Sequence, residues 1–237
     1  EDACLLTAGV DVQDNRLELE LVAWNQYEDT YSIKYHVIPG SPEQKNTWDK
    51  LDLILFHSLN KNRRTFEHSL SKNVALPVLA TCIDMGGHAT QHVLNYCAQR
   101  VGLNVWAING VGGQGKPVWP RKVSKGKYKI PFYSIGVDTA KETIYNRLKN
   151  ETSNTGCCWF PLDREEKYFK QLTSEEVVEK PSRNGPPKRI WDLKAGHKRN
   201  EPLDCRVYAY AALEGLKLHG LVLSEAYRKI VERAGRN

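Results

Sequence analysis

Hydrophobic and polar residues near the start of the chain follow the two-residue period of β-strands. Leu5–Val12 is a short apolar run, Arg16–Trp24 alternates apolar with polar residues, and Asp29–Ile38 follows a further turn. We therefore expect three antiparallel strands in succession. The middle strand should be half-buried, with Glu18 and Glu20 on its polar face.

The pattern then changes to helices that alternate with strands. Helical spacing of apolar residues predicts helices over Thr47–Leu59 and Ala89–Val101, and continuous apolar runs predict strands over Leu76–Ile83 and Asn104–Ile108. Three antiparallel strands followed by this alternation predict an α/β fold in which helices flank a mixed sheet, with parallel strands after the antiparallel ones.

The second half of the chain predicts helices joined by loops and a hairpin. The expected elements are a glycine-rich basic loop over Asn109–Lys129, a helix over Asp138–Asn150, a turn with a short strand over Thr152–Pro161, short helices over Glu165–Glu176, a hairpin over Val177–Lys194, a long helix from about Pro202 to Leu218, and an amphipathic helix over Ser224–Arg236. We expect one domain over residues 1–220 and a basic C-terminal tail helix within residues 221–237.

Three aspartates stand in apolar surroundings that disfavour an uncompensated charge. Asp11 and Asp84 lie at the ends of two predicted strands, and Asp204 lies in the first turn of the last long helix. Ligands collect at the carboxyl edge of open α/β sheets, and a helix N-terminus favours the ionised form of a carboxyl group. Each aspartate alone is equally well explained as a turn or capping residue, whereas the three together predict one acidic site.

An acidic site of this kind suits divalent metal ions. Oxygen ligands favour Mg²⁺ or Mn²⁺ over zinc, and two such ions about 3.5–4 Å apart can hydrolyse a phosphodiester. We therefore take Asp11, Asp84 and Asp204 as candidate catalytic residues and as ligands of two ions. Glu201 precedes Asp204 by one turn of the same helix and is a further candidate ligand.

Composition narrows the class of protein without identifying it. The chain has 237 residues, a net charge of +6 and ordinary fractions of apolar (41%) and charged (26%) residues, so a polyanionic partner is favoured. No apolar run approaches the roughly 20 residues that span a bilayer, and no signal peptide is visible. The six scattered cysteines predict reduced thiols of a cytosolic protein. Because the only methionine is Met85, we expect a domain taken from a longer polypeptide.

A glycine-rich basic segment follows the strand predicted at Asn104–Ile108. Gly110–Lys116 has the GxxxxGK spacing of a phosphate-binding loop, but Pro117 stands where Ser or Thr should bind Mg²⁺, so a nucleotide site is disfavoured. The cations of the segment, with no acid among them, predict contacts with DNA phosphates; a solvated loop is the alternative. These cations are Lys116, Arg121, Lys122, Lys125, Lys127 and Lys129.

Further candidates lie near the predicted acidic site. Lys198 and Arg199 are candidates for DNA contact, and Lys141 is expected to face either the DNA or the site. His88, His197 and Asp138 are candidates for the margin of the site. His88 follows the strand that ends at Asp84, and His197 lies among basic residues. A structural role is the alternative for each, and Asp138 in particular suits a helix N-cap.

Four segments resemble the C-terminal part of the large terminase subunit of lambda-like tailed phages. They are LTAGVDVQDNRLELELVAW, IDMGGHATQHVLNYC, GVDTAKETIYNRL and RNEPLDCRVYAYAAL, and they keep the order of the family from Leu5 to about Leu218. The resemblance implies an endonuclease domain with an RNase H-like fold, and it matches Asp11, Asp84 and Asp204 to the three acids of the family. Some related folds carry Glu at the second position, where Asp84 also supplies a carboxylate.

The same resemblance implies the partners and the place of action. The substrate would be concatemeric double-stranded viral DNA, cut by a phage or prophage protein in the cytoplasm of the host cell. An N-terminal packaging ATPase domain, absent from this chain, would belong to the same polypeptide. The small terminase subunit and the portal of the procapsid would be further partners, and no membrane partner is expected.

Three other functions are compatible with these residues. A different RNase H-like nuclease, such as a junction resolvase, would prefer branched over linear DNA. A non-catalytic docking domain of the packaging motor would gain no thermal stability from Mn²⁺. An ATPase would need to bind nucleotide at Lys116.

Overall fold

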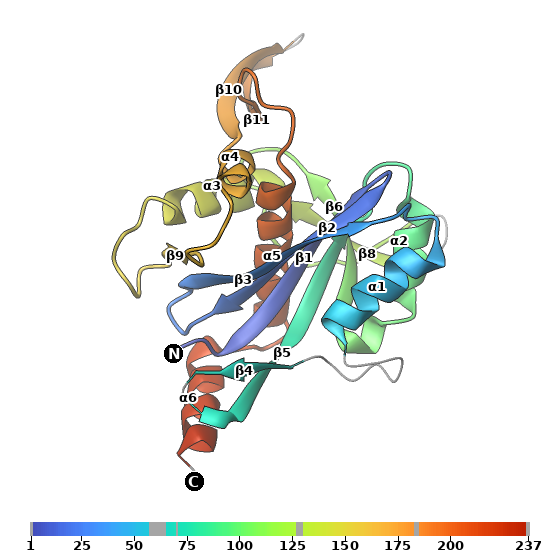
Figure 1. Cartoon of the computed structure of the whole chain (residues 1–237). Helices are drawn as coiled ribbons and strands as arrows, with labels where there is room; N and C mark the ends of the chain where they lie inside the picture. Colours follow the sequence, from blue (N-terminus) through green and yellow to red (C-terminus); the bar gives the residue numbers. More distant parts are fainter. Residues whose placement is uncertain (1, 57–64, 70, 127–129, 183–184, 236–237) are drawn as a thin grey trace.

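A mixed β-sheet with helices on both of its faces forms the centre of the molecule (Figure 1). The structure is a computed structural model that describes residues 2–56, 65–69, 71–126, 130–182 and 185–235.

Strands and helices alternate through most of the chain. The strands are β1 (Leu5–Gln13), β2 (Arg16–Trp24), β3 (Thr30–Pro39), β4 (Thr65–His68), β5 (Ser71–Asp84), β6 (Val105–Val111), β7 (Ser124–Lys125), β8 (Pro131–Gly136), β9 (Cys158–Trp159), β10 (Glu175–Ser182) and β11 (Gly185–Leu193). The helices are α1 (Lys45–Leu55), α2 (Thr90–Ala98), the short 3₁₀ helix η1 (Val101–Leu103), α3 (Val137–Arg147), α4 (Glu166–Leu172), α5 (Glu201–Leu218) and α6 (Leu223–Ala234).

The main sheet combines antiparallel and parallel pairing. Within the described residues its nine strands follow the order β7-β8-β6-β5-β1-β2-β3-β9, with β4 paired to β5. β1, β2 and β3 are antiparallel neighbours, whereas β1, β5, β6 and β8 run parallel to one another. This arrangement confirms the predicted mixed α/β sheet and is consistent with an RNase H-like fold. β10 and β11 form a separate antiparallel hairpin.

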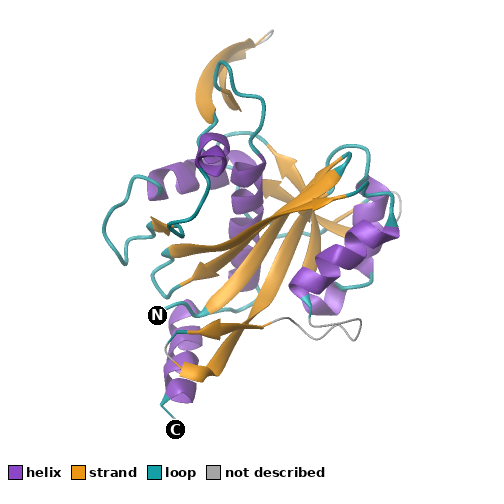
Figure 2. Cartoon of the chain, viewed as in Figure 1, coloured by secondary structure: helices purple, strands orange, loops and turns teal. Residues whose placement is uncertain are grey.

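Two groups of helices cover opposite faces of the sheet (Figure 2). α5 packs against β1, β2 and β5 on one face, where Thr7 Oγ1 donates a hydrogen bond to the carbonyl oxygen of Ala209 at 2.8 Å. α1 packs against β3 and α2 against β5 and β6 on the other face. Because side chains alternate along a strand, Thr7, Gly9 and Asp11 share the face of β1 that α5 covers.

Most predicted elements are present with shifted ends. α1 buries Trp48, Leu51 and Leu55 at the helical spacing that the sequence shows, and it ends at Leu55. The predicted extension of this helix to Leu59 falls within residues 57–64, which lie outside the described residues. The predicted hairpin begins at Glu175, where the pattern had indicated the end of a helix.

Three strands of the main sheet were not predicted. β4 lies in a polar segment, β7 lies within the predicted basic loop and β8 follows it, so none stands out by apolar alternation. β4 forms a hairpin with the extended first half of β5, β8 adds to the sheet beside β6, and β7 pairs with β8. Strand formation in these segments depends on the partner strand, which a local pattern does not record.

The second strand is buried on both faces, so the prediction of a half-buried β2 is wrong. Glu18 and Glu20 are 1% and 0% exposed. Arg206 Nη1 donates to Glu20 Oε1 at 2.6 Å, and Arg199 Nη2 donates to Glu18 Oε1 at 2.5 Å. Alternation of polar and apolar residues indicates two chemically different faces, and here the polar face meets cations instead of water.

The last helix lies at the end of the sheet opposite the hairpin (Figure 1). α6 buries Leu223 and Ile230 and packs against β5, so the predicted C-terminal helix is present and is docked on the sheet. Among the described residues, we find no helix that is both long and apolar enough to cross a membrane.

Candidate active site

Asp11 and Asp84 lie near the ends of two neighbouring parallel strands, Asp84 as the last residue of β5 and Asp11 two residues before the end of β1. β1 and β5 pair in a register that sets Val10 beside Ile83. The residues that follow, Asp11 and Asp84, therefore stand side by side at the carboxyl edge of the sheet. Since Asp11 shares its face of β1 with Gly9, and Gly9 pairs with Cys82, both aspartates belong to the face that α5 covers.

A close approach between α5 and β1 places Asp204. A Cβ atom on Gly9 would lie only 1.9 Å from the carbonyl oxygen of Cys205 and 2.5 Å from the backbone nitrogen of Ala209, so helix and strand backbones touch there. Asp204 directly precedes Cys205, and Asp11 lies two residues beyond Gly9 on the same face. The first turn of α5 therefore brings Asp204 to the end of β1.

Burial and mutual repulsion raise the pKa values of these acids. Burial, followed by the negative charge of Asp204, raises the pKa of Asp11 to about 8, and Asp84 acts in the same direction. Burial also raises the pKa of Asp204 to about 7, against the opposing effect of the Lys141 ammonium group. Burial raises the pKa of Asp84 as well. The three aspartates are thus close enough to affect one another's ionisation.

Neutral groups donate the hydrogen bonds that orient the two strand-end aspartates. Gln13 Nε2 donates to Asp11 Oδ2 at 2.6 Å, and the backbone N–H of Gly86 donates to Asp84 Oδ1 at 3.2 Å. Such donors hold a carboxylate in place without adding a full positive charge. The negative charge that gathers at this edge is therefore suited to a divalent cation.

The neighbouring glutamates, in contrast, are neutralised by arginines. Arg16 Nη2 donates to Glu201 Oε1 at 2.5 Å, and Arg199 Nε donates to the same oxygen at 2.9 Å. The same two arginines bind Glu18, which pairs with Asp11 across β1 and β2. Glu201 lies near the acids as predicted, but two ion pairs already balance its charge, and this geometry does not support a role as metal ligand.

Asp204 has one cation in its surroundings. Lys141 Nζ lies 3.7 Å from Asp204 Oδ1, and it donates shorter hydrogen bonds to both carboxylate oxygens of Glu175, at 2.8 and 2.7 Å. Asn200 Nδ2 donates to Asp204 Oδ2 at 2.9 Å and to Glu175 Oε1 at 2.6 Å. Lys141 is only 9% exposed. A contact with DNA requires an exposed side chain, so Lys141 faces the acids and not the DNA.

The ligand atoms that the three aspartates offer are of the kind that binds magnesium or manganese. They offer only carboxylate oxygens, which these hard cations prefer, and their charge is not balanced by arginine. Within the described residues, no three His, Cys, Asp or Glu side chains are already gathered in the geometry that encloses an ion. A bound cation would have to draw the carboxylates together.

The predicted DNA-binding loop leaves the sheet at the edge where the acids lie. β6 runs parallel to β5, with Ile108 beside Asp84, and the loop begins where β6 ends at Val111. Its described cations Lys116, Arg121, Lys122 and Lys125 are all exposed. Lys127 and Lys129 lie outside the described residues.

The GxxxxGK spacing in this loop does not form a phosphate-binding loop. That motif requires a helix directly after its lysine, whereas the described residues between Lys116 and Gly136 contain the strands β7 and β8 and no helix. Both Pro117 in the sequence and the strands in the structure therefore argue against a nucleotide site at Lys116.

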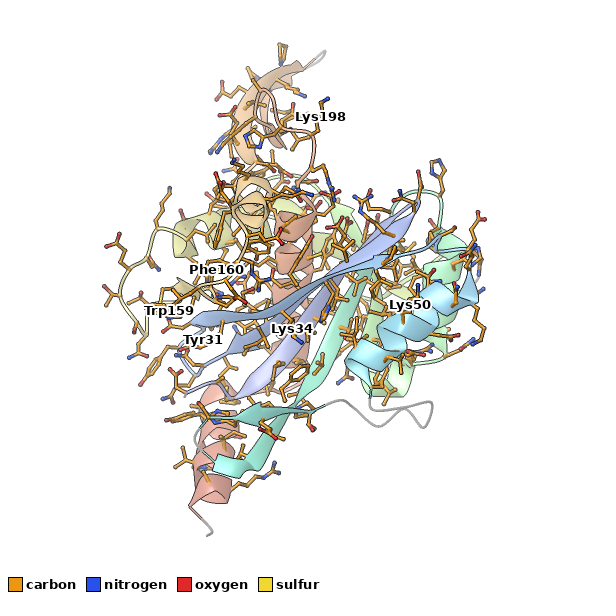
Figure 3. All side chains as sticks on the ribbon, viewed as in Figure 1. Tyr31, Lys34, Lys50, Trp159, Phe160 and Lys198 are labelled. Atoms are coloured by element: carbon orange, nitrogen blue, oxygen red, sulfur yellow. The ribbon has the colours of Figure 1, made fainter. Side chains whose placement is uncertain are left out.

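The basic segment before α5 has one exposed candidate, Lys198, and two half-buried ones, His197 and Arg199. Lys198 is exposed and lies near the hairpin end of the molecule (Figure 3). Arg199 is half-buried because its guanidinium group binds Glu18 and Glu201, so its main partners are acids of the protein. His197 is also half-buried, and its backbone N–H donates to the carbonyl oxygen of Lys194.

Of the remaining candidates, His88 lies at the rim and Asp138 fixes a loop. His88 Nδ1 lies 3.5 Å from Asp14 Oδ1, and both side chains are strongly exposed. Asp138 Oδ2 accepts a hydrogen bond from the backbone N–H of Gly113 at 2.7 Å. Gly136 is the N-cap of α3, so the alternative role of Asp138 as a helix cap does not hold. Its carboxylate instead holds the start of the basic loop.

Several residues at the site were missed by sequence reasoning. Gln13 lies two residues after Asp11 in the same strand. Tyr208 lies one helical turn after Asp204 in α5, and its pKa is raised by burial and then by the charge of Asp204. Strand and helix spacing could have pointed to both. Nothing local pointed to Glu175, which reaches Asp204 through Lys141 and Asn200.

Comparison with known proteins gives consistent matches. The chain matches the family model described as "Terminase large subunit gpA, endonuclease domain" over residues 1–226. It is 31% identical over 216 residues to the terminase large subunit of Enterobacteria phage P21, and 33% identical over 217 residues to that of Escherichia phage lambda. Each match covers 88% of this chain and 32% of the relative, so the chain spans about a third of the length of these relatives. No solved structure gives a significant match.

Proposed function

Since this chain belongs to the family of terminase large-subunit endonuclease domains, we propose that it hydrolyses phosphodiester bonds of double-stranded viral DNA with the help of two Mg²⁺ or Mn²⁺ ions. The observation that carries this proposal is the difference between the acids. Asp11 and Asp84 meet at one sheet edge with neutral hydrogen-bond donors, whereas Glu18 and Glu201 beside them are bound by arginines.

Each part of the site would have a definite task. Divalent ions held there would stabilise the charge on a scissile phosphate and activate the attacking water. Asp11, Asp84 and Asp204 would hold the ions, with Gln13 orienting Asp11 and Asn200 orienting Asp204.

The loop beyond β6 would position the duplex. Lys116 and Lys198 stand at the hairpin end of the molecule. With the other exposed cations of the loop, they would bind backbone phosphates without reading sequence. Site choice would then come from a partner. In the whole protein we propose the small terminase subunit, the portal of the procapsid and an ATPase domain of the same polypeptide as partners, and the host cytoplasm as the place of action.

The test is cleavage of supercoiled plasmid by the purified chain over a range of Mn²⁺ concentrations. Asp11→Asn, Asp84→Asn and Asp204→Asn should each lower the cutting rate by about a hundredfold or more, because even the outer partners of a metal site contribute about 10–100-fold. Asp49→Asn, a partly exposed acid on α1, is the matched control and should cut like the wild type.

Two further measurements separate the alternative functions. Faster cutting of a four-way junction than of linear duplex would favour a resolvase. A chain that neither cuts DNA nor gains thermal stability from Mn²⁺ would be a docking domain, and the proposed activity would be wrong.

A further inference from the structure

A buried lysine beside a site for cations needs an explanation. Lys141 projects from α3 into the region between α3 and α5, and its ammonium nitrogen lies 3.7 Å from Asp204 Oδ1. At a slightly shorter distance this ammonium group would form a full ion pair with Asp204 and compete with a metal ion for the carboxylate. Another group must therefore keep the ammonium nitrogen at this distance from Asp204.

Glu175 is in the position to do so. Its side chain is buried and accepts hydrogen bonds from Lys141 Nζ on both oxygens, at 2.8 and 2.7 Å. The two bonds are about 1 Å shorter than the separation from Asp204, so the lysine is shared unequally in favour of Glu175.

The backbone of Glu175 is also anchored on α3. Tyr145, one helical turn after Lys141, donates its hydroxyl hydrogen to the carbonyl oxygen of Glu175 at 2.7 Å and accepts the backbone N–H of the same residue at 3.1 Å. One face of α3 thus holds Glu175 by its side chain and by its main chain. The glutamate is fixed in place before any metal ion arrives.

We propose that Glu175 is a positioning residue that retains the ammonium group of Lys141 and thereby leaves the carboxylate of Asp204 available to a metal ion. The proposal rests on the proposed function, since it concerns the availability of one candidate ligand. Asn200 completes the arrangement, because its amide donates to both Glu175 and Asp204 and fixes the spacing between them.

The proposal predicts that a second substitution restores Mn²⁺ binding, which a general loss of structure would not allow. Glu175→Gln removes the charge that retains Lys141, so the ammonium group should move onto Asp204 and weaken Mn²⁺ binding by about tenfold or more. Adding Lys141→Met removes the competitor, and the double variant should bind Mn²⁺ within about threefold of the wild type, because the pair it replaces carries no net charge.

The experiment is titration of the intact chain with Mn²⁺ alone, with free Mn²⁺ measured by electron paramagnetic resonance. Glu176→Gln is the matched control, since it removes the same charge from the adjacent, exposed residue of β10, and it should leave binding unchanged. Thermal unfolding in EDTA checks that each variant is folded. If Glu175→Gln does not fold, Glu175→Asp keeps the charge, shortens the reach to Lys141, and should also weaken binding.

The outcomes separate this inference from the proposed function. Mn²⁺ binding that neither Glu175 variant weakens, or a double variant as weak as Glu175→Gln, would overturn the inference alone. Absence of Mn²⁺ binding to the wild type would overturn the inference together with the proposed metal site.

Discussion

At the scale of single residues, acids on β1, β2, β5 and α5 fall into two groups according to their partners. Glu18, Glu20 and Glu201 are bound by arginines and form closed ion pairs. Asp11 and Asp84 accept hydrogen bonds from an amide side chain and a backbone N–H. A buried carboxylate without a cation is costly, so the second group marks the place where the fold leaves a charge for a ligand to balance.

This cost should be visible as a dependence of stability on pH in metal-free buffer. The pKa of Asp11 is raised from 3.8 to about 8 in the folded state, so the folded protein binds this proton more tightly than the unfolded chain. The resulting stabilisation is complete below about pH 3.8 and is lost as the pH rises through about 8. The raised pKa of Asp204, about 7, acts in the same direction. The free energy of unfolding should therefore fall between these pH values.

Urea unfolding in EDTA at several pH values measures this effect. Asp11→Asn should flatten the fall, by at most about 1.4 kcal/mol per pH unit, because asparagine does not titrate. The control Asp49→Asn should keep the wild-type slope. Equal slopes for Asp11→Asn and the wild type would contradict the raised pKa.

At the scale of elements, α5 assembles the site. It packs against β1, β2 and β5, and two of its residues bond to β2: the Cys205 thiol donates to the carbonyl oxygen of Glu18 at 3.2 Å, and Arg206 binds Glu20. The absence of a side chain at Gly9 lets the helix reach the backbone of β1. The position of Asp204 therefore depends on this one close approach.

Gly9→Ala tests that dependence. The new Cβ atom would meet the Cys205 carbonyl oxygen at 1.9 Å, so the first turn of α5 must move. We expect the free energy of unfolding to fall by about 1–3 kcal/mol, as for other overpacked sites, and Mn²⁺ binding to weaken because Asp204 is displaced.

Gly102→Ala is the matched control for this substitution. A Cβ atom there has no heavy atom within 4 Å, so stability and Mn²⁺ binding should be unchanged. Wild-type stability of Gly9→Ala in chemical denaturation would show that helix and strand do not approach as closely as described.

At the scale of the whole molecule, the two ends of the sheet have different roles. The acids, the start of the basic loop after β6 and the hairpin β10–β11 lie at one end, and α6 packs at the other (Figure 1). Lys116 of this loop lines a hollow together with hairpin residues, at the end where the acids lie.

The exposed cations at the end where the acids lie, Lys116 and Lys198, should therefore dominate the salt dependence of DNA binding. Each phosphate contact contributes about 0.9 to the slope of log affinity against log salt concentration. The double variant Lys116→Ala, Lys198→Ala should lower that slope by up to about 2, measured by fluorescence anisotropy with labelled duplex in EDTA. Lys229→Ala, an exposed cation on α6, is the control. A slope that falls equally in both variants would place DNA elsewhere.

Much of the fold and the centre of the candidate site could be predicted from the sequence. The three opening strands, the alternation of helices and strands, and the late helix follow from periodicity, because each element repeats its own spacing of apolar residues. The strand-end positions of Asp11 and Asp84 follow from the same pattern. Glu18 and Glu20 show its limit, since alternation separated them from the apolar face without revealing that arginines cover them.

What the sequence determined by itself is thus local: which segments extend or coil, and which acids stand where a strand ends or a helix begins. Only the tertiary structure decided which charges meet. Lys141 and Glu175 are 34 residues apart, and Arg206 and Glu20 are 186 apart, so no spacing rule joins them. Packing of α5 on β2 brings Arg206 to Glu20, and the start of β10 beside α3 brings Glu175 to Lys141. In this buried interior, the choice of partner decides which carboxylates are neutralised and which are left for metal.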